Sequence, residues 1–320
     1  MKNYLVLTPD GMGSTYLQRL LTVYLNLAGY DYTNTHELLN GLDLVNGGLQ
    51  KNFRGYDQSV EEITELLLLN KSNLVSRIAN YHVKSRLRKK TENYFDLYRT
   101  CETVFCERIM CLRDPFEYAL SWGIRNLSKT LNVYSIQERI AIHPEGKIYD
   151  IDPDYFVKKL KDYSNYMYWC EDNFKVTQIV NYTDLHTDPD PVLQKITGLD
   201  FTFEDVAGIN IVDRNRILYN TSVYIQTKDK SLVPDKAEVV KYLELNKVIK
   251  SLIKSNKLTT DMPIKMNTLV DKSKKVKNFE TLVDTYNNWA KNRNDVETVD
   301  WEKITTRISE ENKIYEPKNS

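Results

Sequence analysis

The most constraining feature of this sequence is a short apolar segment that runs directly into a glycine turn and an amphipathic helix, all within residues 4–28. The segment Tyr4–Leu7 has no side chain polar enough to face water, which indicates a strand buried on both faces. The apolar residues that follow recur at helical spacing, namely Leu17, Leu20, Leu21, Tyr24 and Ala28. The stretch therefore predicts a buried strand, a tight turn and a helix with one apolar face.

The turn itself reads Gly11-Met12-Gly13-Ser14-Thr15-Tyr16. The glycines allow backbone angles that side chains forbid, and the two hydroxyls fall in the first helical turn. A helix N-terminus carries unpaired N–H groups and the positive end of its dipole, so this geometry favours a phosphate or sulfate. A strand-to-helix turn without any ligand explains the same residues about equally well. The lysine of the GxxxxGK[ST] pattern is absent, which disfavours a nucleoside-triphosphate kinase.

Composition excludes several classes of protein. The 320 residues include 44 basic and 44 acidic side chains, so general nucleic-acid binding is not expected. No apolar run reaches the roughly 18 residues of a membrane span, and the first strand begins too early for a signal peptide, so we expect a cytoplasmic protein without a membrane partner. The four cysteines lack CxxC spacing and a nearby histidine pair, so we expect reduced thiols and no metal site.

Strands alternate with helices over much of the chain, and a polar cluster follows each strand. The predicted strands are 31–35, 74–79, 108–112 and 176–182. The clusters are His36-Glu37, Asn80-Tyr81-His82, Arg113-Asp114-Pro115 and Thr183-Asp184-Leu185. This alternation predicts a three-layer α/β fold with a mostly parallel central sheet flanked by helices, and ligands at the carboxyl ends of its strands.

The strand pattern weakens from about residue 200. Residues 234–257 have the pattern of an amphipathic helix, and residues 260–320 are rich in Lys, Asn and Asp, with Leu282 and Tyr286 among a few isolated apolar anchors. We therefore predict an α/β domain over residues 1–230 and a helical C-terminal extension with a frayed tail over residues 231–320.

Four elements, in this order, resemble the sulfotransferase family that uses 3′-phosphoadenosine 5′-phosphosulfate. The resemblance covers roughly residues 1–200. The segment from Gly13 to Leu17 resembles the Gly-Thr-Thr-aromatic segment that wraps the 5′-phosphosulfate. Arg113-Asp114-Pro115 with Ser121 resembles the site of the 3′-phosphate, and Tyr182-Thr183-Asp184-Leu185 is similar to a Tyr-Glu-Asp-Leu segment whose tyrosine lies near the adenine. The fourth element is a pair of candidate bases.

The resemblance implies a P-loop-like sulfotransferase fold and a metal-free enzyme. It would move a sulfonate from this donor to a hydroxyl or amine of an unidentified acceptor and release adenosine 3′,5′-bisphosphate. The donor-binding residues that it implies are Gly11, Met12, Gly13, Ser14, Thr15, Tyr16, Arg113, Ser121 and Tyr182. The family commonly has a lysine two positions before the loop glycine, where this chain has Gly11. Lys84 and Arg86, near a neighbouring strand end, are the candidates to replace it.

Sulfonate transfer needs a base for the acceptor's proton and donors that stabilise the charge that develops. Glu37, with His36 beside it, lies about where carbohydrate- and tyrosine-modifying members of the family have a catalytic glutamate. His82 lies about where small-molecule members have a catalytic histidine, and Glu37 is slightly favoured as the base. His143 and His186 are expected at the surface. Two alternatives stay open, an inactive protein of this fold that binds a nucleotide or partner, and a P-loop-like small-metabolite kinase.

Overall fold

The computed structural model describes residues 2–7, 11–52, 58–79, 94–128, 148–259, 262, 269–291, 293–294 and 301–315. The chain forms two compact units that alternate along the sequence. The first unit comprises Met1–Leu112, Asn165–Ile209 and Leu243–Met262, and the second comprises Arg113–Ser164, Asn210–Tyr242 and Pro263–Ser320. The domain division at residue 230 stays a prediction.

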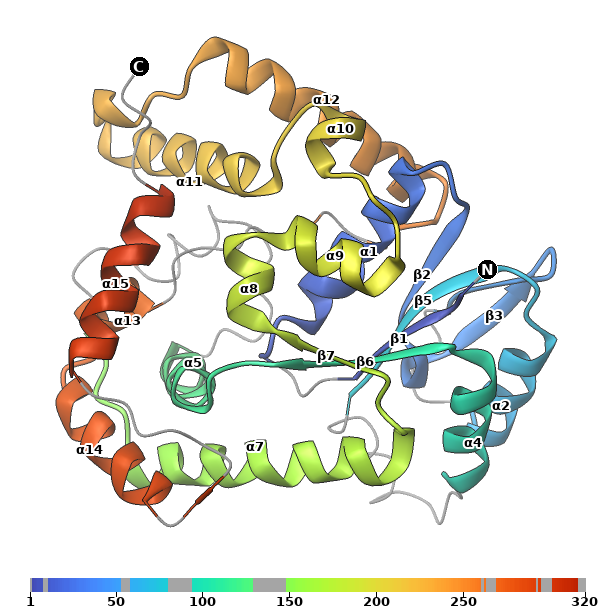
Figure 1. The fold of residues 1–320 in the computed structure, drawn as a ribbon, viewed down its shortest axis with the longest axis horizontal. Helices are drawn as coiled ribbons and strands as arrows, with labels where there is room; N and C mark the ends of the chain where they lie inside the picture. The colour runs from blue at the N-terminus through green and yellow to red at the C-terminus, as the bar shows by residue number, and fades with distance from the viewer. Residues whose placement is uncertain are drawn as a thin grey trace. The chain divides into compact units, whose positions relative to one another are not determined.

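A five-stranded sheet forms the centre of the first unit (Figure 1). Its strands are β1 (Tyr4–Leu7), β2 (Tyr32–Glu37), β5 (Asn73–Ile78), β6 (Glu107–Leu112) and β7 (Gln178–Asn181). Their spatial order is β2-β5-β1-β6-β7, and every neighbouring pair is parallel. The carboxyl ends of all five strands therefore lie at one edge of the sheet, which confirms the predicted parallel arrangement.

Helices cover both faces of this sheet. The helix α1 (Ser14–Leu27) packs against β1, β2 and β5 and also contacts α10 (Phe203–Ala207). The other face is covered by α2 (Val60–Leu69), α4 (Phe95–Val104) and the last turns of α7 (Pro153–Phe174). These helices share one apolar core with Leu5 and Leu7 of β1, whereas Tyr4 and Val6 point to the opposite face, because side chains alternate along a strand. The predicted three-layer α/β fold is confirmed.

A β-hairpin occupies residues where the sequence indicated only a glycine-containing loop. After η1 (Leu38–Asn40), β3 (Leu42–Val45) pairs antiparallel with β4 (Gly48–Lys51). The two residues between them, Asn46 and Gly47, have φ angles of 51° and 79°. Two successive positive φ values are the signature of a type I′ turn, for which Asn-Gly is the favoured pair.

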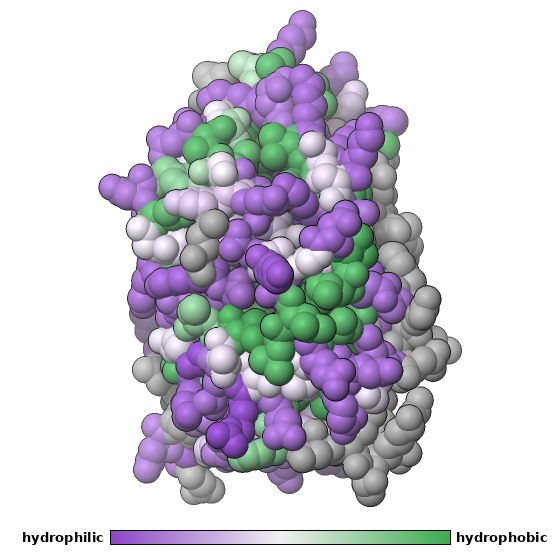
Figure 2. Space-filling view, turned by 90° about the vertical axis from the view of Figure 1, so that its right-hand side faces the viewer, coloured by the Kyte–Doolittle hydropathy of each residue, from purple (hydrophilic) through white to green (hydrophobic). Residues whose placement is uncertain are grey.

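An apolar patch lies on the face seen in Figure 2, where polar side chains surround it. Elements on that side of the first unit include β3 and α2 (Figure 1). Leu68 and Leu69 at the end of α2 are 61% and 57% exposed. The helix ends in four successive leucines, and a helical repeat of about 3.6 residues cannot turn all of them to one face. Leu68 and Leu69 therefore stay exposed.

The second unit is helical. Its core joins α5 (Pro115–Ser128), the first part of α7, α13 (Leu269–Lys275), α14 (Phe279–Ala290) and α15 (Trp301–Tyr315). Phe116 lies among Phe156, Phe279 and Tyr286, with ring centroids 5.6–5.7 Å away. The expectation that Leu282 and Tyr286 are isolated anchors is wrong, since both are buried in this shared core. Each segment contributes only a few apolar residues, so the pattern in any one of them is weak.

The remaining described helices complete both units. They are α8 (Tyr182–Thr187), α9 (Pro189–Thr197), α11 (Ile211–Thr227), η3 (Lys230–Leu232) and α12 (Lys236–Lys254). The amphipathic pattern at 234–257 thus corresponds to α12. None of the helices that the structure describes has both the length and the apolar character needed to cross a membrane.

Candidate functional site

The turn after β1 has the backbone geometry that its glycines predict. Gly11 and Gly13 have φ angles of 94° and 85°, in the region that other residues rarely adopt. Gly13 is the N-cap of α1, no side chain caps the helix through a hydrogen bond, and its first turn contains no acidic residue. The N–H groups and the positive dipole end of α1 therefore favour an anion at this point.

The other residues of the turn divide between the core and the helix start. Met12 and Tyr16 are buried, and the Met12 carbonyl accepts a hydrogen bond from the Cys111 thiol at 3.4 Å. Their side chains thus serve the core. Ser14 is buried and Thr15 half-buried at the first turn of α1.

The ring of Tyr182 lies directly against Gly13. A Cβ atom at Gly13 would lie 2.4 Å and 2.5 Å from two carbons of this ring, closer than real Cβ contacts. Gly13 is therefore required for its positive φ and also for the close approach of Tyr182. The sequence motifs at residues 13 and 182, which are far apart in the chain, are neighbours in the first unit.

His186 packs on the same tyrosine. Its imidazole is stacked on the Tyr182 ring at an interplanar angle of 10° and a centroid distance of 6.0 Å. Residues four apart on a helix share a face, which explains the contact within α8. The expectation of a surface histidine is wrong, because His186 is only 5% exposed.

Arg77 is the residue that the sequence analysis missed. It lies in β5, is 6% exposed, and its Nη1 donates to Ser14 Oγ at 3.1 Å and to Thr15 Oγ1 at 2.7 Å. A guanidinium thus reaches the hydroxyls at the uncapped start of α1. The available signal was the one charged residue of a mostly apolar strand, where a buried charge needs a specific partner.

Glu37 is that partner. The β2–β5 register places Glu37 opposite Arg77, and Oε2 of the carboxylate lies 3.2 Å from the arginine Nε. The other oxygen, Oε1, accepts a hydrogen bond from the Ala79 N–H at 3.1 Å. The side chain of Glu37 is fully buried, so this carboxylate is held by the guanidinium and the backbone.

Of the two histidine candidates, only His36 lies in the described part of the chain. Its φ is 61°, at a register shift in the β2–β5 ladder, and its carbonyl accepts a hydrogen bond from Gln18 Nε2 at 2.6 Å. His82, Lys84, Arg86 and His143 lie outside the described residues.

Two further cations belong to this region of the first unit. Burial lowers the pKa of Lys51, and the nearby charges of Arg19 and Arg77 lower it further. Arg19, on α1, is only 1% exposed. A nearby anion would favour the charged form of Lys51. Among the described residues, no group of His, Cys, Asp or Glu side chains that could hold a metal ion is found.

Arg113 and Ser121 lie together in the second unit, on a network centred on Glu117. Arg113 Nη2 lies 3.1 Å from Glu117 Oε2, and the Ser121 hydroxyl donates to the Glu117 carbonyl at 2.8 Å. The predicted cap is present, since Asp114 Oδ1 accepts from the Glu117 N–H at 3.0 Å. Arg113, just before α5, and Ser121, within it, thus both contact Glu117, which is four residues from each.

The C-terminal helices add two cations to this network. Arg307 of α15 pairs with Glu117 and, at 3.3 Å, with Asp114, and Lys272 of α13 donates to Ser121 Oγ at 2.5 Å. Burial raises the pKa of Asp114 in spite of the opposing effect of Arg307 and Arg113. No sequence pattern indicated that the C-terminal helices supply charged residues to α5.

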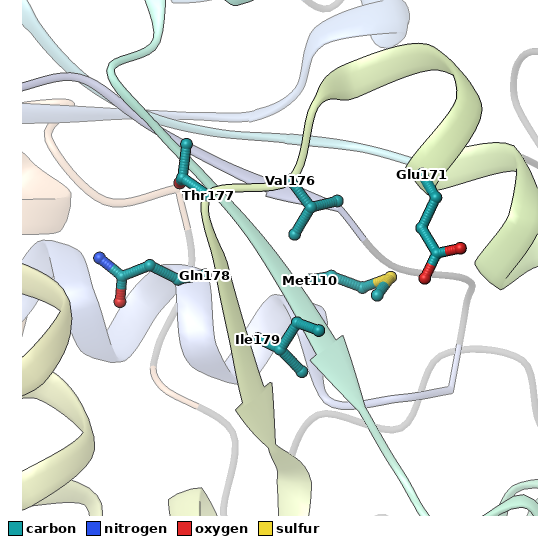
Figure 3. A pocket seen from close by; sticks show the side chains of 6 residues that line it. All are labelled: Met110, Glu171, Val176, Thr177, Gln178 and Ile179. Atoms are coloured by element: carbon teal, nitrogen blue, oxygen red, sulfur yellow. The ribbon is translucent and has the colours of Figure 1, made fainter. Parts of the chain in front are cut away.

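A cavity of about 400 Å³ lies at a different edge of the sheet (Figure 3). It is lined by Met110, Glu171, Val176, Thr177, Gln178 and Ile179, around the amino end of β7. Its lining contains one carboxylate and no cation, so it lacks the chemistry of an anion site.

Comparison with known proteins adds one structural similarity. The sequence matches no family model and no curated protein. Among solved structures, the chain is similar to the crystal structure of a sulfotransferase from Alicyclobacillus acidocaldarius, with 12% sequence identity and a TM-score of 0.36, over 75% of this chain and 99% of that chain.

Proposed function

We propose that this chain is a sulfotransferase that moves a sulfonate from 3′-phosphoadenosine 5′-phosphosulfate to a hydroxyl or amine of an acceptor. The observation that carries the proposal is the oxyanion cradle of the first unit. It consists of the uncapped start of α1, the hydroxyls of Ser14 and Thr15, and the Arg77 guanidinium bonded to both. The turn at residues 11–16 follows β1, Arg113 follows β6 and Tyr182 follows β7, which supports the proposal.

The parts of the donor have separate proposed partners. The 5′-phosphosulfate is assigned to residues 11–16, whose backbone and hydroxyl donors suit a tetrahedral oxyanion. Tyr182, whose ring covers Gly13, is assigned to the adenine. The assignment of the 3′-phosphate to Arg113 and Ser121 comes from the sequence motif alone, and there a guanidinium would supply charge-assisted hydrogen bonds.

The reaction asks for positioning and charge stabilisation more than for covalent help. As in phosphoryl transfer, the entering and leaving oxygens stand in line, and donors stabilise the charge on the equatorial and leaving oxygens. The base candidates are His36, Glu37 and His82. No step in this scheme uses a metal ion, and we propose none.

The experiment that tests the proposal has two stages. Titration calorimetry with adenosine 3′,5′-bisphosphate and, separately, with ATP distinguishes a sulfotransferase fold from a kinase. We expect the bisphosphate to bind at least about tenfold more tightly, a difference of about 1.4 kcal/mol. A radiolabelled sulfate donor is then supplied with panels of phenols, sugars and amines. Tighter binding of ATP would contradict the proposal, and bisphosphate binding without transfer to any panel would favour a binding protein.

A further inference from the structure

We propose that Arg77 is the cation that stabilises the leaving phosphate of the donor, and that Glu37 is the positioning residue of Arg77 and not the base. The inference rests on the proposed function and assigns roles within the same site. It gives the chain, in Arg77 of β5, a substitute for the lysine that the family resemblance leads one to expect at Gly11.

The contacts of Arg77 differ from those of an arginine that only supports the fold. Arg108 in β6 is such an arginine, because its donors reach backbone carbonyls, including those of Phe105 and Phe174, each at 2.7 Å. Among the residues that the structure describes, Arg77 donates to no backbone carbonyl. Its Nη1 reaches Ser14 and Thr15, the two side chains that open α1. The charge therefore lies where the N–H groups of the helix start also favour an anion.

A buried guanidinium is expensive unless it is paired, and its pairing here is incomplete. Among the described residues its carboxylate partner is Glu37, whose Oε2 lies 3.2 Å from Nε, without the two parallel bonds of a bidentate pair. An oxyanion on the loop would add a second negative partner.

Glu37 is placed to orient this arginine. The ladder register sets the two residues opposite each other, and the Ala79 N–H fixes the second carboxylate oxygen at 3.1 Å. The guanidinium lies against one carboxylate oxygen and the Ala79 N–H bonds the other, so both oxygens are already engaged within the fold. The proton of the acceptor then passes to an imidazole, for which His36 is the candidate among the described residues.

The transfer of the sulfonate forms one bond to sulfur and breaks another. The acceptor oxygen or nitrogen forms a new bond to sulfur and gives its proton to the imidazole. The bond between sulfur and the bridging oxygen breaks, and the electron pair stays on that oxygen. The bridging oxygen becomes part of the 5′-phosphate of adenosine 3′,5′-bisphosphate, where Arg77 stabilises its charge.

The test uses Arg77→Ala, Arg77→Lys, Glu37→Gln and the double variant Glu37→Gln/Arg77→Ala in the full chain. Arg108→Ala is the matched control, since it also removes a strand arginine of the first unit. We expect Arg77→Ala to lower kcat at least about 100-fold, the usual scale for a lost oxyanion donor. Guanidinium ion at millimolar concentration should restore part of this activity. Arg108→Ala should keep its kcat and show no such rescue.

The double variant separates positioning from proton transfer. If Glu37 acts through Arg77, Glu37→Gln should lower kcat without moving the acidic limb of the pH–rate profile. In the Arg77→Ala background it should change kcat by less than about threefold, because residues that act as a unit are not additive. Losses that multiply, together with a displaced acidic limb, would show that Glu37 is the base and would overturn the assignment.

A binding measurement distinguishes failure of this inference from failure of the proposed function. The probes are inorganic pyrophosphate and adenosine 3′,5′-bisphosphate, titrated into the wild type, Arg77→Lys, Arg77→Ala and Arg108→Ala. If pyrophosphate binding weakens at least about tenfold in Arg77→Ala and in none of the other variants, Arg77 is supported as the anion ligand. This conclusion holds even if the nucleotide does not bind and the proposed function fails. Arg77→Lys, which keeps the charge, should retain most of the binding. Equal pyrophosphate binding in the wild type and Arg77→Ala would overturn the inference.

Discussion

Replacement of Gly13 by alanine should destabilise the first unit more than an ordinary glycine substitution does. The φ of 85° at Gly13 costs a residue with a Cβ atom roughly 1–2 kcal/mol. The added Cβ would also lie 2.4 Å from the Tyr182 ring, and such overpacking in a core typically costs about 1–3 kcal/mol. Because the two effects are independent in origin, we expect a loss of about 2–5 kcal/mol in the free energy of unfolding.

Gly29 provides a matched control for the backbone part of this loss. Its φ is 84°, and no atom lies within 4 Å of the Cβ that alanine would add. Gly29→Ala should therefore cost only the roughly 1–2 kcal/mol of the left-handed conformation. The difference between the two variants isolates the overlap with Tyr182.

The assay is urea denaturation followed by circular dichroism, with the midpoint and slope fitted for each variant. Tyr182→Ala in the Gly13→Ala background removes the overlap, so the double variant should lose less stability than the two single losses added together. If Gly13→Ala and Gly29→Ala are equally stable, the ring does not approach Gly13 as closely as described, and the reasoning fails.

Two further predictions concern ligand binding and pH. Arg113→Ala should weaken the binding of adenosine 3′,5′-bisphosphate by about 1.5–3 kcal/mol and leave that of adenosine 5′-monophosphate nearly unchanged, and calorimetry with equal losses for both ligands would contradict the assignment of the 3′-phosphate. The second prediction is that the Glu107 carboxylate makes the unfolding free energy depend on pH. Burial raises its pKa, but bonds from Lys2, Gln178 and Thr177 outweigh this and hold the pKa below the ordinary 4.5. Since the folded pKa is depressed, this contribution is present above about pH 4.5 and is lost as the pH falls through the folded pKa. Glu107→Gln should therefore flatten the fall of the unfolding free energy between about pH 5 and 3, and an unchanged slope in urea titrations would contradict it.

The fold of the first unit could be predicted because its signals are local. A buried strand next to the sheet centre is apolar throughout, as Tyr4–Leu7 is, and the helix after it shows its buried face as a 3.6-residue repeat. The hairpin at Leu42–Lys51 was missed although Asn46-Gly47 is a strong turn signal, because its short strands are mostly exposed or half-buried and show no clear alternation.

The C-terminal region was harder to predict for a different reason. Its helices bury a shared core with α5 and α7, so the apolar residues that belong together are more than 100 positions apart, as Phe116 and Phe279 are. Charged contacts such as that of Arg307 with Glu117 follow from the same packing. No local pattern encodes either of them.

The site shows the same division between local and long-range information. Three features follow from the geometry of one strand end or one helix: the glycine turn, the capping aspartate of α5 and the Arg113–Ser121 spacing. The structure contains the positive φ angles of the turn, the bond from the Glu117 N–H to Asp114, and the bond from Ser121 to Glu117. The link between Glu37 and Arg77, which are 40 positions apart in the sequence, instead depends on the register between β2 and β5. A shift of that register by one residue would turn Arg77 to the opposite face of the sheet, away from Ser14 and Thr15. A glutamate at a strand end therefore resembles a base when it is seen alone, and its proposed role in positioning an arginine emerges only once the neighbouring strand is in place.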